Sequence, residues 1–217
     1  MRDFFAGPFF PFTLLSLFMV LFLYLLPKRG KQQFQLLLNH FEGKFSFPLG
    51  NFSFIDQGIQ FNLTRIARTV VGYLPTGAYP VLWFYAQPAS RFIIGNVKSK
   101  DFTRGNFLIM PEFEVLQLGD VEILAGLNDQ KLRAEMMAII SDAELYPVLK
   151  ELFATGFHHL TGAYEYHVHS FFLIKKHYVI RYVGLPHEIF SDPTILEVKL
   201  ASLQKLIIKL KIKPYSG

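Results

Sequence analysis

Residues 45–63 read FSFPLGNFSFIDQGIQFNL, and phenylalanine repeatedly alternates there with small or polar residues. A period of two predicts β-strands that bury one face and expose the other. The segments Pro-Leu-Gly-Asn and Asp-Gln-Gly are rich in turn-forming residues and divide the stretch into three parts. The stretch therefore predicts a three-stranded antiparallel meander with its phenylalanines inward and its serines outward.

Further short apolar runs follow, separated by proline and glycine. Runs this short that contain aromatic and β-branched residues favour strands over helices. We expect strands at 81–85, 92–94, 107–110, 121–127, 157–160, 166–174 and 178–183. The segment Thr161-Gly-Ala-Tyr164 is expected to be a turn, and Trp83 is expected to lie in the core.

Helical spacing of apolar residues appears in four other places. The pattern predicts a helix over 32–41, a helix capped by Asn128 or Asp129, a helix begun by Asp142 and closed by Gly156, and a last helix capped by Ser191. Because the strands come in consecutive groups, the chain is expected to be an α+β protein. Its predicted architecture is a mainly antiparallel sheet with two or three packing helices and a C-terminal helix.

The N-terminal segment predicts a single transmembrane helix. Residues 9–26 are almost wholly apolar, and at about 1.5 Å per residue they match a hydrocarbon core of about 30 Å. A cleaved signal peptide is the alternative, but its apolar region is shorter and ends in a small-residue cleavage site. The predicted organisation is an anchor with a short tail over 1–30, a juxtamembrane helix over 31–43 and a soluble α+β domain over 44–217.

The charges beside this segment predict its orientation. Arg2 and Asp3 nearly cancel before it, whereas Lys28, Arg29 and Lys31 follow it. Basic residues concentrate on the cytoplasmic side of a membrane helix, so the C-terminal domain is expected to be cytoplasmic.

Composition excludes several classes of function. The chain has no cysteine, which rules out disulfides, thiolate metal sites and a thiol nucleophile. The net charge of +5 is modest and forms no basic stripe with interleaved aromatics, so nucleic acid is not an expected partner. An anionic lipid surface is a better match, with contacts at Lys205, Lys209, Lys211 and Lys213 of the C-terminal region.

Histidine is the one unevenly distributed residue type, with five between positions 158 and 177. On a strand, Glu165, His167 and His169 share one face, and the expected turn at 161–164 would bring His158 or His159 opposite them. The candidate metal ligands, for zinc or iron, are His158, Glu165, His167 and His169. The competing interpretation is a solvent-facing strand surface, and no long-range ligand motif supports the metal.

These patterns together favour an interaction protein over an enzyme. The leading hypothesis is a single-pass, non-catalytic accessory subunit that contacts integral membrane proteins, because the chain has an anchor, 24 phenylalanines and no catalytic motif. The alternatives are a membrane-tethered metal-dependent enzyme that uses the histidine-rich strands, and a lipid-surface-binding or sensing domain.

Overall fold

The computed structural model describes residue 16 and residues 31–46, 50–67, 78–98, 113–170 and 173–215. Side chains within these ranges are described except at 65–67, 78–79, 168–170 and 173. In this part of the chain, no helix combines the length and the apolar character that crossing a membrane requires. The predicted anchor at 9–26 lies outside the described residues apart from Ser16, and so does the predicted strand at 107–110.

The described strands form one large antiparallel sheet in the order β1-β2-β3-β4-β9-β8-β5-β7-β6. This confirms the predicted α+β class with a mainly antiparallel sheet. The strands are β1 (Lys44–Ser46), β2 (Asn51–Asp56), β3 (Ile59–Ala67), β4 (Ala78–Ala86), β5 (Phe92–Asn96), β6 (Phe113–Leu118), β7 (Val121–Leu127), β8 (His159–Ser170) and β9 (Leu173–Val183).

The predicted meander is present as β1, β2 and β3. Phe45 pairs with Phe52, and Phe54 pairs with Phe61, so the phenylalanines of neighbouring strands lie side by side on one face. Phe52 and Phe61 are fully buried, and full burial of such a side chain is worth about 2 kcal/mol. The alternation read from the sequence therefore corresponds to one buried row of aromatic rings.

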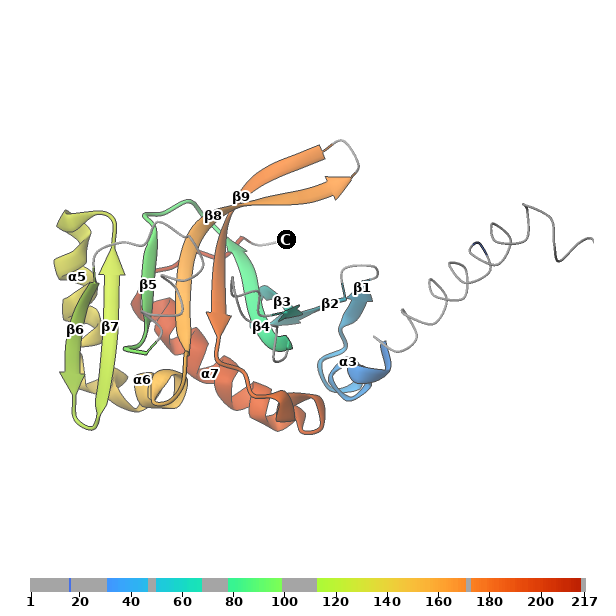
Figure 1. Ribbon diagram of the computed structural model, residues 1–217, viewed down its shortest axis with the longest axis horizontal. Coiled ribbons are helices and arrows are strands. Elements are labelled where there is room, and N and C mark those ends of the chain that lie inside the picture. Colours follow the sequence, from blue (N-terminus) through green and yellow to red (C-terminus); the bar gives the residue numbers. More distant parts are fainter. Residues whose placement is uncertain are drawn as a thin grey trace, which may run out of the picture.

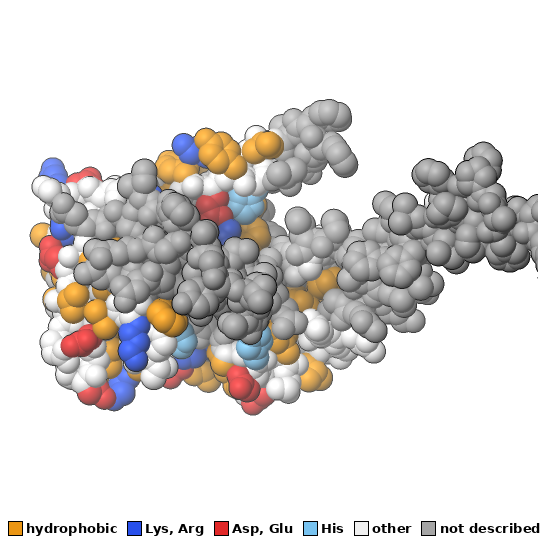
Figure 2. All heavy atoms as spheres, viewed as in Figure 1, with side chains coloured by type: hydrophobic (Ala, Val, Ile, Leu, Met, Phe, Trp, Pro, Cys, Tyr) orange, Lys and Arg blue, Asp and Glu red, His pale blue; other side chains and the backbone are white. Residues whose placement is uncertain are grey.

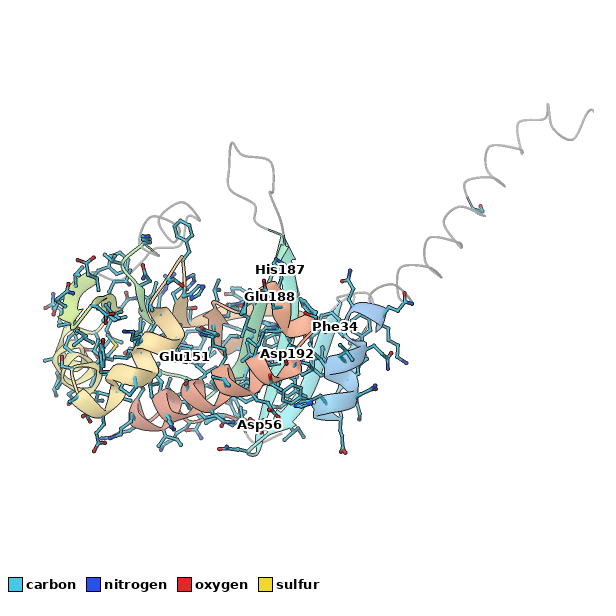
Figure 3. The ribbon with its side chains drawn as sticks, turned by 90° about the horizontal axis from the view of Figure 1, so that it is seen from below. Phe34, Asp56, Glu151, His187, Glu188 and Asp192 are labelled. Atoms are coloured by element: carbon cyan, nitrogen blue, oxygen red, sulfur yellow. The ribbon has the colours of Figure 1, made fainter. Side chains whose placement is uncertain are left out.

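Helices pack against this same face of the sheet (Figure 1). The described helices are α3 (Gln35–Phe41), α5 (Gln130–Ile140), α6 (Tyr146–Phe153) and α7 (Pro193–Lys209), with short 3-10 turns η1 (Ala143–Leu145) and η2 (His187–Phe190). Figure 3 shows α3 beside the start of α7, where Phe34 and Asp192 lie. The ring of Phe34 meets that of Phe190 edge to face at 5.1 Å between centroids, which attaches α3 to the main core.

The helix caps agree with the predictions in two places and differ in one. Asp129 accepts a hydrogen bond from the backbone N–H of Lys131 at the start of α5, and Asp142 caps η1, which leads into α6. At α7 the cap is Asp192, which accepts from the N–H of Thr194, so the prediction of Ser191 was wrong by one residue.

The largest correction concerns the predicted turn at 161–164. Residues 159–170 form the single strand β8, which pairs along its length with β9. Gly162 is required there by close packing, because a Cβ at this position would lie 2.3 Å from Cε1 of Phe92 and 2.5 Å from the hydroxyl of Tyr178. The glycine that suggested a turn instead makes room for two aromatic rings.

The outer half of the β8–β9 hairpin extends beyond the rest of the sheet (Figure 1). We call residues 164–170 and 173–177 the hairpin arm. The strands remain paired there, from Tyr164 with Tyr178 to Ser170 with Leu173, with a register irregularity between Val168 and Ser170. The arm is therefore a continuous piece of β-structure that projects from the domain.

Candidate functional site

The predicted metal ligands do not come together as a set. Glu165 and His167 lie on the hairpin arm, whereas His158 precedes β8 at its opposite end. Glu165 lies seven positions after His158 along extended chain, a distance on the order of 20 Å. The side chain of His169 lies outside the described side chains, and among the described residues no three His, Asp or Glu side chains are grouped to hold a metal ion.

Glu165 and His167 instead belong to a cluster on the sheet face opposite the helices. We call Trp83, Tyr85, Glu165, His167, His177 and Arg181 the bracing cluster. Alternation along the strands places these side chains on one face. The intervening positions on β4 and β9 hold residues buried under the helices, namely Leu82, Phe84, Ile180 and Tyr182. The register brings the strands into contact by pairing Trp83 with Arg181 and Glu165 with His177.

A chain of polar contacts links the arm to β4 and β9. The hydroxyl of Tyr85 lies 3.3 Å from Nδ1 of His167, and Nε2 of the same imidazole lies 3.4 Å from Oε2 of Glu165. Arg181 donates from Nε and from an Nη to the two carboxylate oxygens of Glu165, which is a bidentate pair. The polar atoms of the arm are thus connected to the body of the sheet through side chains.

Aromatic contacts enclose the same imidazoles. The ring centroid of His167 lies 5.2 Å from that of Trp83, and the centroid of His177 lies 4.5 Å from that of Tyr85. His167 and His177 meet at right angles with their centroids 6.0 Å apart. Packing by these rings fixes the position of each imidazole, in addition to the hydrogen bonds.

The electrostatics of the bracing cluster favour a structural role over acid–base chemistry. Burial raises the pKa of Tyr85, and the nearby carboxylate of Glu165 raises it further, so the phenol stays protonated at neutral pH. A protonated phenol can donate to Nδ1 of His167, and in the tautomer that accepts this bond the Nε2–H of His167 faces Glu165. Glu165 is meanwhile paired with Arg181, so the four groups satisfy one another.

Sequence reasoning found Glu165 and His167 but missed Trp83, Tyr85 and Arg181. The alternation Trp83, Tyr85 against Leu82, Phe84 on β4 was a usable signal for a second functional face. The sequence does not reveal that β4 pairs with β9. This pairing brings Tyr85 to His167, which lies 82 positions later in the chain.

His158 and His159 have a different environment, beside α6. His159 is buried, and Nδ1 lies 2.9 Å from the carbonyl oxygen of Phe157. Burial lowers its pKa to about 4. Burial and then the nearby Lys199 also lower the pKa of His158, so both imidazoles are neutral at physiological pH and act as packed side chains.

The hairpin arm exposes apolar and aromatic side chains beyond the bracing cluster. The exposed fraction is 73% for Tyr166, 63% for Ile174 and 49% for Tyr164. The ammonium of Lys176 lies 4.6 Å from the ring centroid of Tyr164. Figure 2 shows hydrophobic side chains with a basic one among them along this arm, at the top of the view.

The four lysines predicted to contact lipid do not share one helix face. Lys205 is exposed on α7, but Lys209 forms ion pairs with Asp142 and Glu144, at 3.4 and 3.1 Å. Helix α7 ends at Lys209, so Lys211 lies in the turn that follows it, with a left-handed φ of 55°, and Lys213 lies in the C-terminal segment beyond that turn. Two of the four lysines therefore lie beyond the last helix.

Comparisons of this chain with protein-family models, with curated proteins and with solved structures find no match.

Proposed function

We propose that this protein is a non-catalytic accessory subunit of a membrane protein complex, and that the hairpin arm docks on an integral membrane partner. The observation that carries the proposal is the exposure of Tyr166 and Ile174 on a projecting but internally braced hairpin. Exposed aromatic side chains held in a fixed position are favourable anchors for a protein interface, because little conformational entropy is lost when they are buried.

The bracing cluster supports this role. A two-stranded hairpin is marginally stable in water when it has no further packing. The contacts of Tyr85 and Arg181 with the arm hold it against the sheet without burying Tyr166 or Ile174. The arrangement therefore keeps the outer side chains of the arm available while restricting its motion.

Membrane attachment is part of the same proposal. Residues 9–26 form the single transmembrane anchor, and the basic residues Lys28, Arg29 and Lys31 keep the C-terminal domain on the cytoplasmic side. Confinement to the membrane raises the effective concentration of the arm beside an integral membrane partner, so a modest interface is sufficient.

The test is quantitative co-purification of the full chain in a mild detergent. The interface variant is Tyr166→Ser with Ile174→Ser. The matched control is Ile55→Ser with Ile208→Ser, which also removes two exposed apolar side chains, 70% and 71% exposed, on β2 and α7. Truncation of interface anchors typically weakens binding by about 2 kcal/mol, so the interface variant should bind its membrane partner with roughly thirtyfold lower affinity.

We expect the wild type and the control to recover the same stoichiometric membrane protein and the interface variant to lose it. Recovery of the wild type as a lone monomer in every detergent would contradict the proposal. Equal recovery of the partner by the interface variant and the control would contradict the assignment of the interface to the arm.

A further inference from the structure

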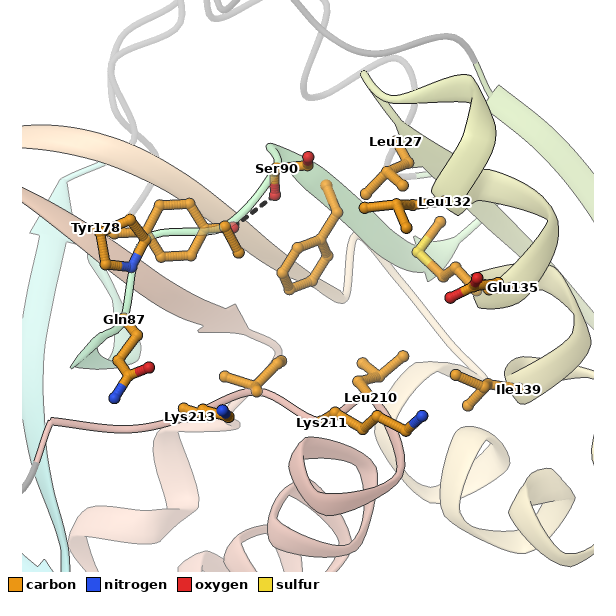
Figure 4. A pocket seen from close by; sticks show the side chains of 15 residues that line it. Gln87, Ser90, Leu127, Leu132, Glu135, Ile139, Tyr178, Leu210, Lys211 and Lys213 are labelled. Carbon is orange, nitrogen blue, oxygen red and sulfur yellow. Dashed lines mark hydrogen bonds between the residues drawn. The ribbon is translucent and has the colours of Figure 1, made fainter.

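A cavity of about 390 Å³ lies between α5, the β4–β5 connection and the C-terminal segment (Figure 4). This size falls within the range of small-molecule sites, about 300–1,000 Å³. A compact single-chain molecule therefore fits this volume.

The interior of the cavity is apolar. Phe92, Leu127 and Met136 line it and are largely buried in the core. Leu132 and Ile139 also line the cavity from α5, the helix of Met136, and Leu210 lies across from Leu132 (Figure 4). Such a lining favours the aliphatic part of a ligand, because binding there removes apolar surface from water.

The shape of the cavity is set before any ligand binds. Tyr178 donates a hydrogen bond of 2.7 Å to the carbonyl oxygen of Ser90, shown as a dashed line in Figure 4. Tyr178 and Phe92 both pack closely over Gly162, which has no side chain to displace them. Because the tyrosine hydroxyl is already engaged, ligand recognition depends on the other polar groups at the cavity.

Two of those groups are cationic. Lys211 and Lys213 lie on the C-terminal segment, and Glu135 lies on α5 across the cavity (Figure 4). Neither lysine forms an ion pair with a described acidic side chain, unlike Lys209 on the preceding helix. The net charge of these three residues is +1, which matches a head group with one negative charge better than one with two.

The backbone holds both lysines in place. The N–H of Gln87 donates to the carbonyl oxygen of Lys213 at 2.8 Å, and the N–H of Tyr215 donates to the carbonyl oxygen of Tyr85 at 3.0 Å. The N–H of Ile212 donates back to the carbonyl oxygen of Ile207, which turns the chain after α7. The segment is thus fixed along β4 with its two lysines beside the apolar cavity.

From these features we infer that the cavity binds a single-chain aliphatic carboxylate of medium length, such as decanoate. The chain occupies the apolar interior against α5, and the carboxylate pairs with Lys211 and Lys213. This inference rests on the cavity alone and does not depend on the docking of the hairpin arm.

The test is photo-labelling of the full chain in lipid nanodiscs with a decanoate that carries a diazirine in its chain, followed by peptide mass spectrometry. The charge variant is Lys211→Glu with Lys213→Glu, and its matched control is Lys44→Glu with Lys205→Glu, two lysines outside the cavity lining. A second variant, Leu132→Trp, fills the cavity from a partly exposed helix position and leaves the charges intact. A decylammonium probe with the same diazirine tests the sign of the head group.

We expect adducts in the peptides that contain 132–139 and 210–213, with competition by unlabelled decanoate. Labelling of these peptides should fall about tenfold in the charge variant and in Leu132→Trp and stay unchanged in the control. Equal labelling by the cationic probe, or unchanged labelling in both cavity variants, would overturn the inference. Measurement of the unfolding temperature of each variant ensures that lost labelling is scored only in folded protein.

Discussion

The hydroxyl of Tyr85 lies 3.3 Å from Nδ1 of His167 and joins β4 to the outer half of the β8–β9 hairpin. Together with the pair between Arg181 and Glu165 and the ring contacts of Trp83 and Tyr85, this contact connects the hairpin arm to the sheet through side chains. Among the described residues, Tyr166 on the arm is the most exposed large hydrophobic side chain. Its position is therefore set by residues far from it in the sequence.

Tyr85→Phe tests this link. Removing the hydroxyl leaves Nδ1 of a partly buried imidazole without its partner, which should lower the free energy of unfolding by about 1 kcal/mol. Hydrogen exchange of the arm amides should accelerate more than exchange in β2 and β3. Tyr164→Phe, at an exposed position of the arm, is the control and should change neither quantity.

Replacing only one partner of the pair between Glu165 and Arg181 should lower the free energy of unfolding more than replacing both. The side chains are each about a quarter exposed, so Glu165→Gln or Arg181→Met alone should cost about 1–2 kcal/mol after allowance for solvent screening. Denaturant unfolding of the two single variants and the double variant gives the coupling energy, expected to be about 1 kcal/mol. Additive effects would show that the bidentate geometry contributes nothing to stability.

His159 should make the protein less stable in mild acid. Its pKa is about 4 in the folded protein, because burial disfavours the charged ring, against about 6.5 when unfolded. The unfolded chain therefore binds more protons between these values, so stability is complete above about pH 6.5 and falls as the pH decreases toward 4. The loss is on the order of 3 kcal/mol across this window.

Denaturant unfolding of the wild type and of His159→Gln across pH 4 to 7 measures this effect. His158 contributes in the same direction, since its pKa is also lowered, so the variant should retain part of the slope. Identical slopes in the two proteins would show that His159 does not titrate as its burial requires.

Gly162→Ala should destabilise the protein by overpacking. The added Cβ meets Cε1 of Phe92 at 2.3 Å and the hydroxyl of Tyr178 at 2.5 Å, and such crowding typically costs about 1–3 kcal/mol. Combining it with Phe92→Leu removes the closest ring atoms and should recover part of the loss. Thermal unfolding compares Gly162→Ala, Phe92→Leu and the double variant. An unchanged unfolding temperature in Gly162→Ala would show that the two rings separate easily.

Local patterns predicted the elements of the fold well where one period dominates. The phenylalanine alternation of β2 and β3 and the cap of α5 at Asp129 follow from interactions within a few residues. The continuous strand β8 was not predicted, because Gly162 resembles a turn residue until the packing of Phe92 against it is known. Strand β6 also gave no clear signal, since Val115 is exposed and its alternation is weak.

The candidate site was harder to predict because it is assembled across strands. The spacing of Glu165 and His167 correctly placed them on one face, but their partners Tyr85 and Arg181 depend on which strands are neighbours. The cavity has the same origin, since α5, β9 and the C-terminal segment meet there only in the folded chain. Sequence periodicity predicts which face of a strand or helix a side chain occupies. It does not predict which distant residues the side chain contacts.

Site-specific photo-crosslinking from the hairpin arm tests the central claim most directly. A benzophenone amino acid replaces Tyr166 in the full chain in cells, and the same replacement at Ile55, 70% exposed on β2, is the control. We predict one discrete adduct with an integral membrane protein from position 166 and none from position 55. Absence of a protein adduct at 166, or the same adduct from both positions, would contradict the assignment of the hairpin arm as the docking surface.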